Sequence, residues 1–521
     1  MTVVQRLSGA HGTRDRRIRA TGALALSALV LGTATACAGS PANESGNSTD
    51  AGTLNLQYSA PPGTLDPWAQ GPAMLQQAMY DTLTHVDKSG DAVPWLATSW
   101  KFTDAKTLEI RLRTGVKFTD GTVFDAAAVV TNLEYGKKNA SNGSKSVLAQ
   151  VKSVTAVNSS TVRITLASPN PDLPVAFATG SAGYMVSPKS LANPGSLRLA
   201  SNGTGPYQLD TSRTVAGQKY VLKQNTNYWS PKTYPFSQVT MKIVTDRTAQ
   251  VNAVRSGSLD VLAISPGTST SGLTIQKGAA ALGQGIALLD VEGKINKALG
   301  DVRVRRALNY AIDREALIET VLDGDAEANP SVPANSSSAG WSEKLAGMYT
   351  YDPDKARQLL KEAGYGSGFD LKVLSTPAAD GLVQAIAGYL RKVGVNVTIE
   401  DHTSDLLQQA MSGKWAAGNT NLSVTGRTFT DITLSMTPGA FFNFQHVDDP
   451  KITELLAEAG GATGEAARNK IYGELLDYAA GQAWYIIPGL INTRTAYDAK
   501  KVRLTNGSTQ AVALYNIQPA D

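Results

Sequence analysis

Apolar and polar residues alternate in three short stretches of the first two hundred positions. Residues 54–58, 107–118 and 161–166 each show a period of two, which is typical of half-buried β-strands. Between these stretches lie turn signals rich in Gly, Pro, Asn and Asp, including Asp-Gly after the second one. Tight turns between short strands favour antiparallel pairing. We therefore predict an α+β region with antiparallel strands over about residues 85–200.

Helix-start signals recur along the chain, each an aspartate placed directly before apolar residues at helical spacing. These candidate caps are Asp125, Asp301, Asp313 and Asp352. The last one precedes Pro353, a residue favoured at the first helical position, and we expect this helix to end at Gly364. The chain after residue 286 is therefore predicted to be rich in helices.

Strands and helices alternate between residues 371 and 399. A strand over 371–373 is followed by a helix over 383–393 and by a second strand over 395–399. A connection of helical length between two strands implies that the strands pair in parallel. Residues 286–487 are therefore predicted to form an α/β domain.

The N-terminus has the layout of an export signal. A group of arginines precedes an apolar stretch over 20–32, and small residues then lead to Cys37. We interpret residues 1–36 as a signal peptide that is excluded from the fold. The thiol of Cys37 lies at the expected cleavage point, where it can be acylated and the same Cys becomes the new N-terminus. In this the segment resembles a bacterial lipoprotein signal. Residues 37–53 are small and polar, and we expect a flexible tether.

Two other interpretations of the N-terminus remain open. It could be a plain secretory signal in which the cysteine is incidental. Arg16 and Arg17 also suggest twin-arginine export, although the apolar residue expected after that pair is Arg19 here. We expect the body of the protein on the extracytoplasmic face of the membrane, held there by a lipid on Cys37.

Composition excludes several classes of protein. The chain has 521 residues, of which 42% are hydrophobic, so it can bury sizeable cores and is not a disordered chain. A single cysteine cannot form a disulfide within the chain. The net charge of +4 comes from the first 36 residues, since 43 basic and 43 acidic residues remain without them. A neutral body argues against a nucleic-acid partner.

The motifs of common enzymes and of nucleotide-binding sites are missing from the sequence. It holds no G-x-S-x-G, no G-x-x-x-x-G-K-[ST], no G-x-G-x-x-G and no H-E-x-x-H. Only four histidines occur, and they show no metal-ligand spacing. We therefore expect neither an enzyme nor a resident metal or cofactor, and we interpret His402 and His446 as surface or hydrogen-bonding residues.

A series of ordered motifs resembles one protein family. The motifs are VPWLATSW (93–100), LRTGVKFTDG (112–121), FDA (124–126), GTGPY (203–207), NTNYW (225–229), SGSLD (256–260), DVRVRRAL (301–308), AIDR (311–314) and YDPDKA (351–356). In this order they resemble the family 5 extracellular solute-binding proteins of ABC transporters, the oligopeptide, dipeptide and nickel type. The resemblance extends over essentially all of residues 53–521.

The resemblance implies an α/β fold of two lobes that close like the clamp of a periplasmic binding protein, with an additional α+β domain inserted in the first lobe. The implied order is signal peptide 1–36, lipidated cysteine and tether 37–53, first lobe 54–94, inserted domain 95–200, first lobe 201–285, second lobe 286–487 and first lobe 488–521. The hinge is then expected near residue 285 and near Ile487–Pro488. Ligand contacts made only in the closed form shift the population towards closure.

The resemblance also points to residues 415–444 for ligand recognition, where peptide-binding members carry an acidic residue that pairs with the ligand ammonium. The aspartate expected after Trp415 is Ala416 here, which puts peptide specificity in question. Asp431 is the remaining carboxylate; it either takes the ammonium role or caps a helix starting at Ile432. Arg427 could pair with a ligand carboxylate or with Asp431.

Aromatic residues of the same region are candidates for an apolar ligand pocket, with core packing as the alternative for each Phe. The aromatic candidates are Trp415, Phe429, Phe441, Phe442 and, from the first lobe, Tyr58.

The functional hypothesis is a monomeric, lipid-anchored receptor of an ABC importer that delivers a peptide or similar small solute to a permease with its ATPases. Two alternatives remain: a binding protein for a non-peptide solute such as a sugar or amino-acid conjugate, or a sensor that feeds no transporter. An exported hydrolase on the same scaffold is a further alternative without a nucleophile–base pair to support it. Nickel is disfavoured by the scarcity of histidine.

Overall fold

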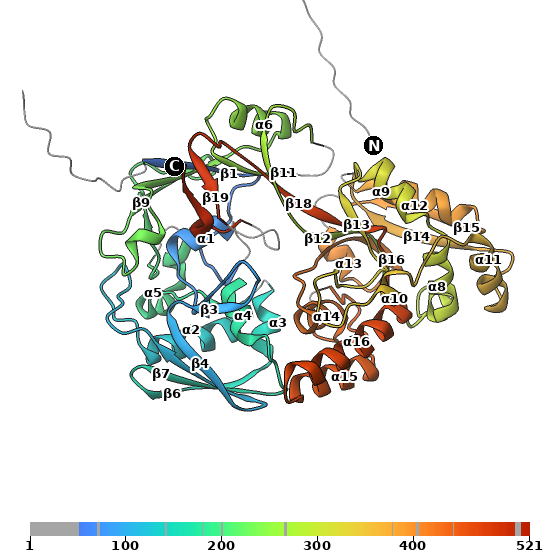
Figure 1. Ribbon diagram of the computed structural model, residues 1–521, viewed down its shortest axis with the longest axis horizontal. Coiled ribbons are helices and arrows are strands. Elements are labelled where there is room, and N and C mark those ends of the chain that lie inside the picture. The colour runs from blue at the N-terminus through green and yellow to red at the C-terminus, as the bar shows by residue number, and fades with distance from the viewer. Residues whose placement is uncertain are drawn as a thin grey trace, which may run out of the picture. The chain divides into compact units, whose positions relative to one another are not determined.

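In the computed structural model, the described strands form sheets of two, four and eight strands, and helices pack around them (Figure 1). The described residues are 52–69, 73–140, 143–179, 181–198, 202–264, 268–377, 379–402, 406–440, 442–505 and 512–520. The predicted signal peptide, Cys37 with most of its tether, and Phe441 lie outside the described residues.

A four-stranded sheet begins at the first predicted strand. Its order is β1 (Thr53–Tyr58), β10 (Gln238–Ile243), β9 (Lys219–Gln224) and β8 (Tyr207–Leu209). β1 pairs in parallel with β10, and the other pairs are antiparallel. The alternation read in the sequence puts Leu54 and Leu56 on the buried face of β1.

A second sheet is wholly antiparallel, as the sequence predicted. Its order is β4 (Ala97–Asp104), β5 (Thr107–Leu112), β7 (Thr161–Leu166) and β6 (Val151–Asn158). The strand predicted over 107–118 ends at Leu112, because the chain then turns at Gly121 and only an isolated bridge joins Lys117 to Val123.

Short helices and a hairpin accompany these two sheets. They are α1 (Ala73–Met79), α2 (Ala126–Asn139), α3 (Ser144–Ala149), α4 (Leu173–Thr179), α5 (Pro188–Ala192) and α6 (Arg247–Arg255), with the hairpin strands β2 (Thr84–Val86) and β3 (Ala92–Pro94). Near the C-terminus, β19 (Val502–Leu504) pairs with β20 (Ile517–Pro519).

A mixed eight-stranded sheet forms the rest of the framework. Its main path is β11 (Val261–Ile264), β18 (Gly489–Tyr497), β12 (Thr274–Leu288), β16 (Ala417–Ser423), β14 (Phe369–Ser375) and β15 (Val395–Asp401), with β13 (Ala326–Ala328) paired to β18 and β17 (Tyr485–Ile486) paired to β12. β14 and β15 are parallel and α12 (Asp380–Arg391) connects them, which confirms the predicted crossover.

The predicted aspartate caps are confirmed. The carboxylate of Asp125 accepts from the amide of Ala128 at 2.9 Å, and that of Asp352 accepts from the amide of Lys355 at 2.8 Å. Asp301 and Asp313 cap their helices in the same way.

The helices that accompany the eight-stranded sheet, besides α12, are α7 (Lys297–Gly300), α8 (Val302–Tyr310), α9 (Arg314–Val321), α10 (Glu343–Ala346), α11 (Pro353–Glu362), α13 (Leu406–Ala410), α14 (Thr428–Met436), α15 (Pro450–Gly461) and α16 (Glu465–Gln482).

Buried apolar side chains form two large cores, and we name two lobes after them. The core of the first lobe contains side chains from Leu54 to Val261 and again from Val502 to Ile517. The core of the second lobe contains side chains from Ala280 to Ile491. Both chain ends of the described unit therefore belong to the first lobe, and the middle of the chain builds the second.

Two antiparallel strands run side by side from one lobe to the other (Figure 1). β12 pairs with β18 from Thr274–Tyr497 to Gly283–Leu490, and the register shifts around Ala280. Such irregularities bend a strand locally.

Within the described residues, we find no helix with the length and apolar character needed to span a bilayer.

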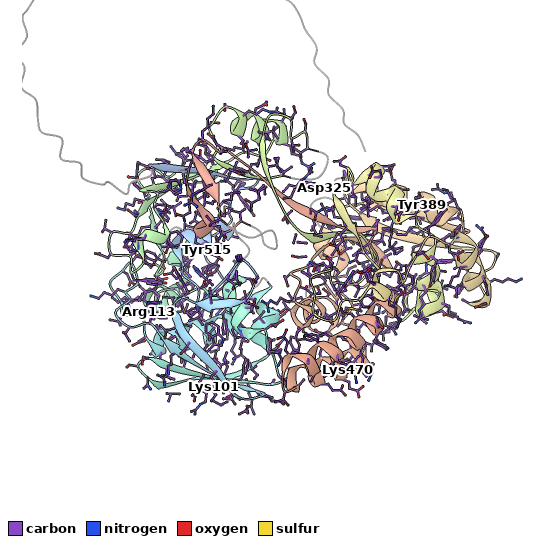
Figure 2. The ribbon with its side chains drawn as sticks, viewed as in Figure 1. Lys101, Arg113, Asp325, Tyr389, Lys470 and Tyr515 are labelled. Carbon is purple, nitrogen blue, oxygen red and sulfur yellow. The ribbon has the colours of Figure 1, made fainter. Side chains whose placement is uncertain are left out.

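A buried carboxylate ties these two strands together. Asp325 lies between them, with Oδ1 3.1 Å from Lys277 Nζ of β12 and Oδ2 3.0 Å from Arg494 Nε of β18 (Figure 2). The side chains of Asp325 and Arg494 are only 7% and 12% exposed. In addition to the backbone pairing of β12 with β18, Asp325 therefore connects a side chain of each strand, and its ion pair with Arg494 is largely buried.

Candidate functional site

The segment predicted to recognise a ligand forms a loop and the helix α14. This helix begins at Thr428, so the predicted start at Ile432 is wrong. The carboxylate of Asp431 points back at the loop and accepts from Thr425 N at 3.0 Å, from Thr425 Oγ1 at 2.7 Å and from Arg427 N at 3.1 Å. The loop before α14 supplies these donors. The Asp431 carboxylate therefore fixes this loop to the first turn of α14, and it does not cap a helix that begins at Ile432.

Arg427 reaches the first lobe. Its Nη2 donates to the carbonyl of Gly90 and lies 2.7 Å from Asp91 Oδ1. Both partners belong to the turn between β2 and β3. The guanidinium therefore pairs with another part of the chain, and Arg427 contacts Asp431 through its backbone: its amide donates to the carboxylate, and its carbonyl accepts from the amide of Asp431 at 2.8 Å.

Two further polar contacts join α14 and its surroundings to the first lobe. Thr430 donates its hydroxyl to Asp172 Oδ2 at 2.9 Å and its amide to the same oxygen at 3.3 Å. The hydroxyl of Ser146 donates to the carbonyl of Gly439 at 3.2 Å. We call Asp91, Asp172, Arg427 and Thr430 the interlobe contact.

The electrostatics of this region depend on one buried carboxylate, Asp431, and one partly buried carboxylate, Asp172. Burial raises the pKa of Asp431 to about 7; the bonds from Thr425 oppose this shift and the charge of Asp172 adds to it. Burial also raises the pKa of Asp172, against the bonds from Thr430 and the charges of Arg427 and Arg468. A carboxylate removed from water is harder to ionise.

A second carboxylate site positions the hairpin that Arg427 contacts. Asp81 is 2% exposed and accepts from Trp95 Nε1 at 2.8 Å, Tyr228 OH at 2.7 Å and Trp229 Nε1 at 3.0 Å. Burial raises its pKa to about 6, in spite of these bonds. Three residues from two separate sequence motifs are thus held by one carboxylate at the base of the hairpin.

Aromatic stacking fixes the same base. The ring of His85 lies between Trp95, at 3.9 Å, and Tyr515, at 4.3 Å, and Arg113 lies 4.1 Å from the ring of Trp229. Figure 2 labels Arg113 and Tyr515 in this part of the first lobe. Burial lowers the pKa of His85 to about 3, so the ring is neutral. The hairpin tip that contacts Arg427 is therefore presented by a rigid base.

The predicted aromatic candidates do not gather in one place. Phe429 is 4% exposed and belongs to the second core. Trp415 is half-buried, with Nε1 3.3 Å from Gln409 Oε1. Tyr58 ends β1 and packs against the first core.

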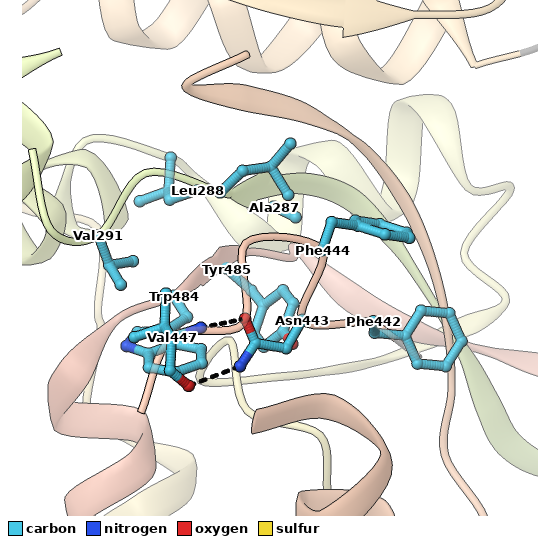
Figure 3. Close-up of a pocket in the computed structure, with 10 residues that line it drawn as sticks. Ala287, Leu288, Val291, Phe442, Asn443, Phe444, Val447, Trp484 and Tyr485 are labelled. Carbon is cyan, nitrogen blue, oxygen red and sulfur yellow. Dashed lines mark hydrogen bonds between the residues drawn. The ribbon is translucent and has the colours of Figure 1, made fainter. Parts of the chain in front are cut away.

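Phe442 lines a small cavity in the second lobe (Figure 3). The cavity has a volume of about 10 Å³, and its lining consists of Ala287, Leu288, Leu289, Val291, Phe442, Asn443, Phe444, Val447, Trp484 and Tyr485. The side chain of Asn443 closes one side by bonding both backbone groups of Val447, at 2.8 and 3.0 Å. Such a volume holds one water at most, so this cavity is no pocket for a solute.

No metal centre is evident in the part of the chain that the structure describes. There, no three His, Cys, Asp or Glu side chains are grouped so that they could hold an ion.

Sequence reasoning found Arg427 and Asp431 but missed their surroundings. Asp172 and Asp91 could be interpreted from the sequence only as a helix-start residue and a turn residue. Asp81 carried no signal at all. The signals present were local, and the contacts that matter join positions far apart in the chain.

Comparisons with known proteins agree with this architecture. A model of the bacterial extracellular solute-binding proteins, family 5, matches residues 91–445. The glutathione-binding protein GsiB of Escherichia coli K12 is 28% identical over 435 residues, covering 78% of this chain and 83% of that protein.

Two solved structures share the fold. One is DppA of Helicobacter pylori in complex with the peptide STSA, with a TM-score of 0.75, 21% identity and coverage of 90% of this chain and 98% of the other. The other is NikA of Brucella suis in complex with Fe(III)-EDTA, with a TM-score of 0.74, 23% identity and coverage of 90% and 99%. The predicted two-lobed fold is confirmed.

Proposed function

Because the chain belongs to family 5 of the bacterial extracellular solute-binding proteins, we propose that it captures a peptide or similar small solute between its lobes and delivers it to the permease of an ABC importer. The ligand leaves chemically unchanged. The protein acts as a receptor and not as an enzyme.

The interlobe contact carries this proposal. Arg427 and Thr430 of the second lobe bond to Asp91 and Asp172 of the first. The two cores are otherwise separate clusters, linked by the strand pair β12–β18. Two rigid bodies joined by a narrow link and by a few polar contacts are suited to hinge closure around a ligand.

The lobe boundaries are part of the proposal. We assign residues 54–94, 201–285 and 488–521 to the first lobe, 95–200 to its inserted domain and 286–487 to the second lobe. The two core clusters support an arrangement in which the middle of the chain forms the second lobe.

A peptide is the proposed ligand class. The support is the 28% identical relative named for binding glutathione, which is a short peptide. The fold alone does not decide the ligand, since the two solved neighbours hold a tetrapeptide and a metal chelate. Among the residues of the predicted ligand region, Arg427 is the candidate to bind a ligand carboxylate in exchange for Asp91, and Asp431 is a positioning residue for the loop that carries it.

The N-terminal sequence supports a proposal for the cellular site. We propose that residues 1–36 are removed and that a lipid on Cys37 holds the protein on the outer face of the cytoplasmic membrane. The Cys37→Ser variant is then expected to appear in the soluble fraction. Retention of this variant in the membrane fraction would contradict the anchor.

The experiment that tests the function is mass spectrometry of the ligand released from purified full-length protein. We expect intact peptides in the wild type, and the same peptides in reduced yield in Arg427→Ala. The matched control is Arg163→Ala, which removes an arginine that pairs with Glu109 inside the first lobe and should leave the yield unchanged. Recovery of sugars alone would overturn the ligand class, and cleavage of added peptide would overturn the receptor role.

A further inference from the structure

Two carboxylates lie at the interlobe contact, one from each lobe. Asp172, at the start of α4 in the first lobe, accepts two bonds from Thr430. Asp431 directly follows Thr430 in the chain and is 1% exposed. Thr430 therefore places the Asp172 carboxylate beside the first turn of α14, and the charge of Asp172 raises the pKa of Asp431.

The donors around these acids are mostly uncharged. Asp172 receives a hydroxyl and an amide of Thr430, and Asp431 receives donors of Thr425 and the amide of Arg427. Among the described residues, neither acid forms an ion pair, and the guanidinium of Arg427 is paired with Asp91. Asp431 is buried and Asp172 is partly buried, and like charges at such positions disfavour each other's ionised form.

We propose that closing of the lobes takes up one proton at the Asp172–Asp431 pair, so that the closed form is favoured as the pH falls through neutrality. The proton comes from solvent and rests on one carboxyl group of the pair. The inference rests on the proposed function only in requiring lobes that open and close.

The sign of the effect follows from the environments of the two forms. In an open form Asp172 is separated from Thr430 and Asp431, and water solvates its charge. In the closed form burial raises the pKa values of both acids. The closed form therefore binds more protons at a given pH, and acid shifts the equilibrium towards it. The pair titrates jointly, so the proton is not assigned to one residue.

Other charged groups also lie around the pair. Arg427 comes from the loop before α14, and Arg468 comes from α16; both lower the pKa of Asp172. Tyr472 of α16 feels the charge of Asp172, and its pKa is raised above the ordinary value, mainly by burial. Asp91 lies in the hairpin turn and pairs with Arg427.

Small-angle X-ray scattering of the full-length protein without added ligand tests the inference between pH 5.5 and 8.5. For the wild type we expect a radius of gyration that falls as the pH is lowered, with a closing equilibrium that changes by up to about tenfold per pH unit where one proton is taken up. Asp172→Asn keeps an oxygen that can accept from Thr430 but cannot titrate, so its profile should be flat and compact.

Two more variants keep the test decisive if one of them folds poorly. Thr430→Val retains both acids and removes the hydroxyl donor, which favours the ionised form of Asp172, so closing should weaken at high pH and the dependence of the radius of gyration on pH should become steeper. Asp354→Asn changes a 90% exposed aspartate outside the contact and should behave like the wild type. A wild-type profile without pH dependence, or an Asp172→Asn profile equal to that of the wild type, would overturn the inference. Peptide recovered by mass spectrometry with a flat scattering profile would overturn the inference alone and leave the receptor function intact.

Discussion

The guanidinium of Arg427 lies 2.7 Å from the carboxylate of Asp91, although 336 positions separate the two residues in the chain. Each is held by its own lobe. Asp431 accepts from the amide of Arg427, and the hairpin that ends in Asp91 is fixed at its base by Asp81 and His85. The Arg427–Asp91 ion pair therefore depends on the distance between the two lobes.

Loss of this contact should favour the open form. In Arg427→Ala the Asp91 carboxylate and the Gly90 carbonyl lose their shared donor. The pair is partly exposed, so we expect a cost of about 0.2–1 kcal/mol, which lowers the closed-to-open ratio by a few-fold at most. Scattering at constant pH measures this as a larger radius of gyration. Arg163→Ala serves as the control within one lobe, and equal radii for both variants would contradict the role of Arg427.

Stability should fall in acid because His85 is buried as the neutral ring. Its pKa is lowered to about 3 in the fold, against about 6.5 in an unfolded chain. The unfolded state thus binds a proton first, and stability is lost as the pH falls from about 6.5 towards 3, by at most about 1.4 kcal/mol per pH unit. His85→Phe keeps a ring between Trp95 and Tyr515 and should flatten this part of the profile.

Urea unfolding at several pH values measures the difference. The exposed His446 provides a matched control, and His446→Asn should reproduce the wild-type profile because asparagine tolerates the positive φ of that position. An unchanged profile in His85→Phe would show that the acid sensitivity arises elsewhere.

A methyl group at Gly285 should disturb the link between the lobes. A Cβ built there would lie 2.1 Å from the carbonyl oxygen of Ile486, a backbone atom fixed by the pairing of β12 with β17. Gly285→Ala should therefore lower the free energy of unfolding by about 1–3 kcal/mol. Gly388→Ala, in open space within α12, should instead stabilise by about 0.5–1 kcal/mol. Similar effects of the two substitutions on thermal unfolding would contradict the close approach.

Removal of Asp325 should be among the most damaging single changes. Asp325→Ala leaves the largely buried Arg494 without its carboxylate, and loss of one partner of a buried pair costs about 3–5 kcal/mol. Lys277→Ala, at the 70% exposed end of the same cluster, should cost less than 1 kcal/mol. Chemical denaturation of the three proteins decides this, and a small effect of Asp325→Ala would mean that the ion pair does not hold the strands.

The sequence alone was sufficient for features that depend on near neighbours. The helix caps at Asp125 and Asp352 were predictable because a cap bonds to an amide three residues away. The parallel pair β14–β15 was predictable because two successive strands joined by a helix commonly pair in parallel. The family motifs then implied the two lobes.

The tertiary structure decided which carboxylates face each other. Nothing local distinguishes Asp431 as a ligand anchor from Asp431 as the acceptor for Thr425, because the same carboxylate can do either. Asp172 and Thr430 are 258 positions apart, and their contact exists only because two separately packed cores bring α4 and α14 together. Local signals extend over a few residues, whereas the interlobe contact depends on the packing of the whole chain.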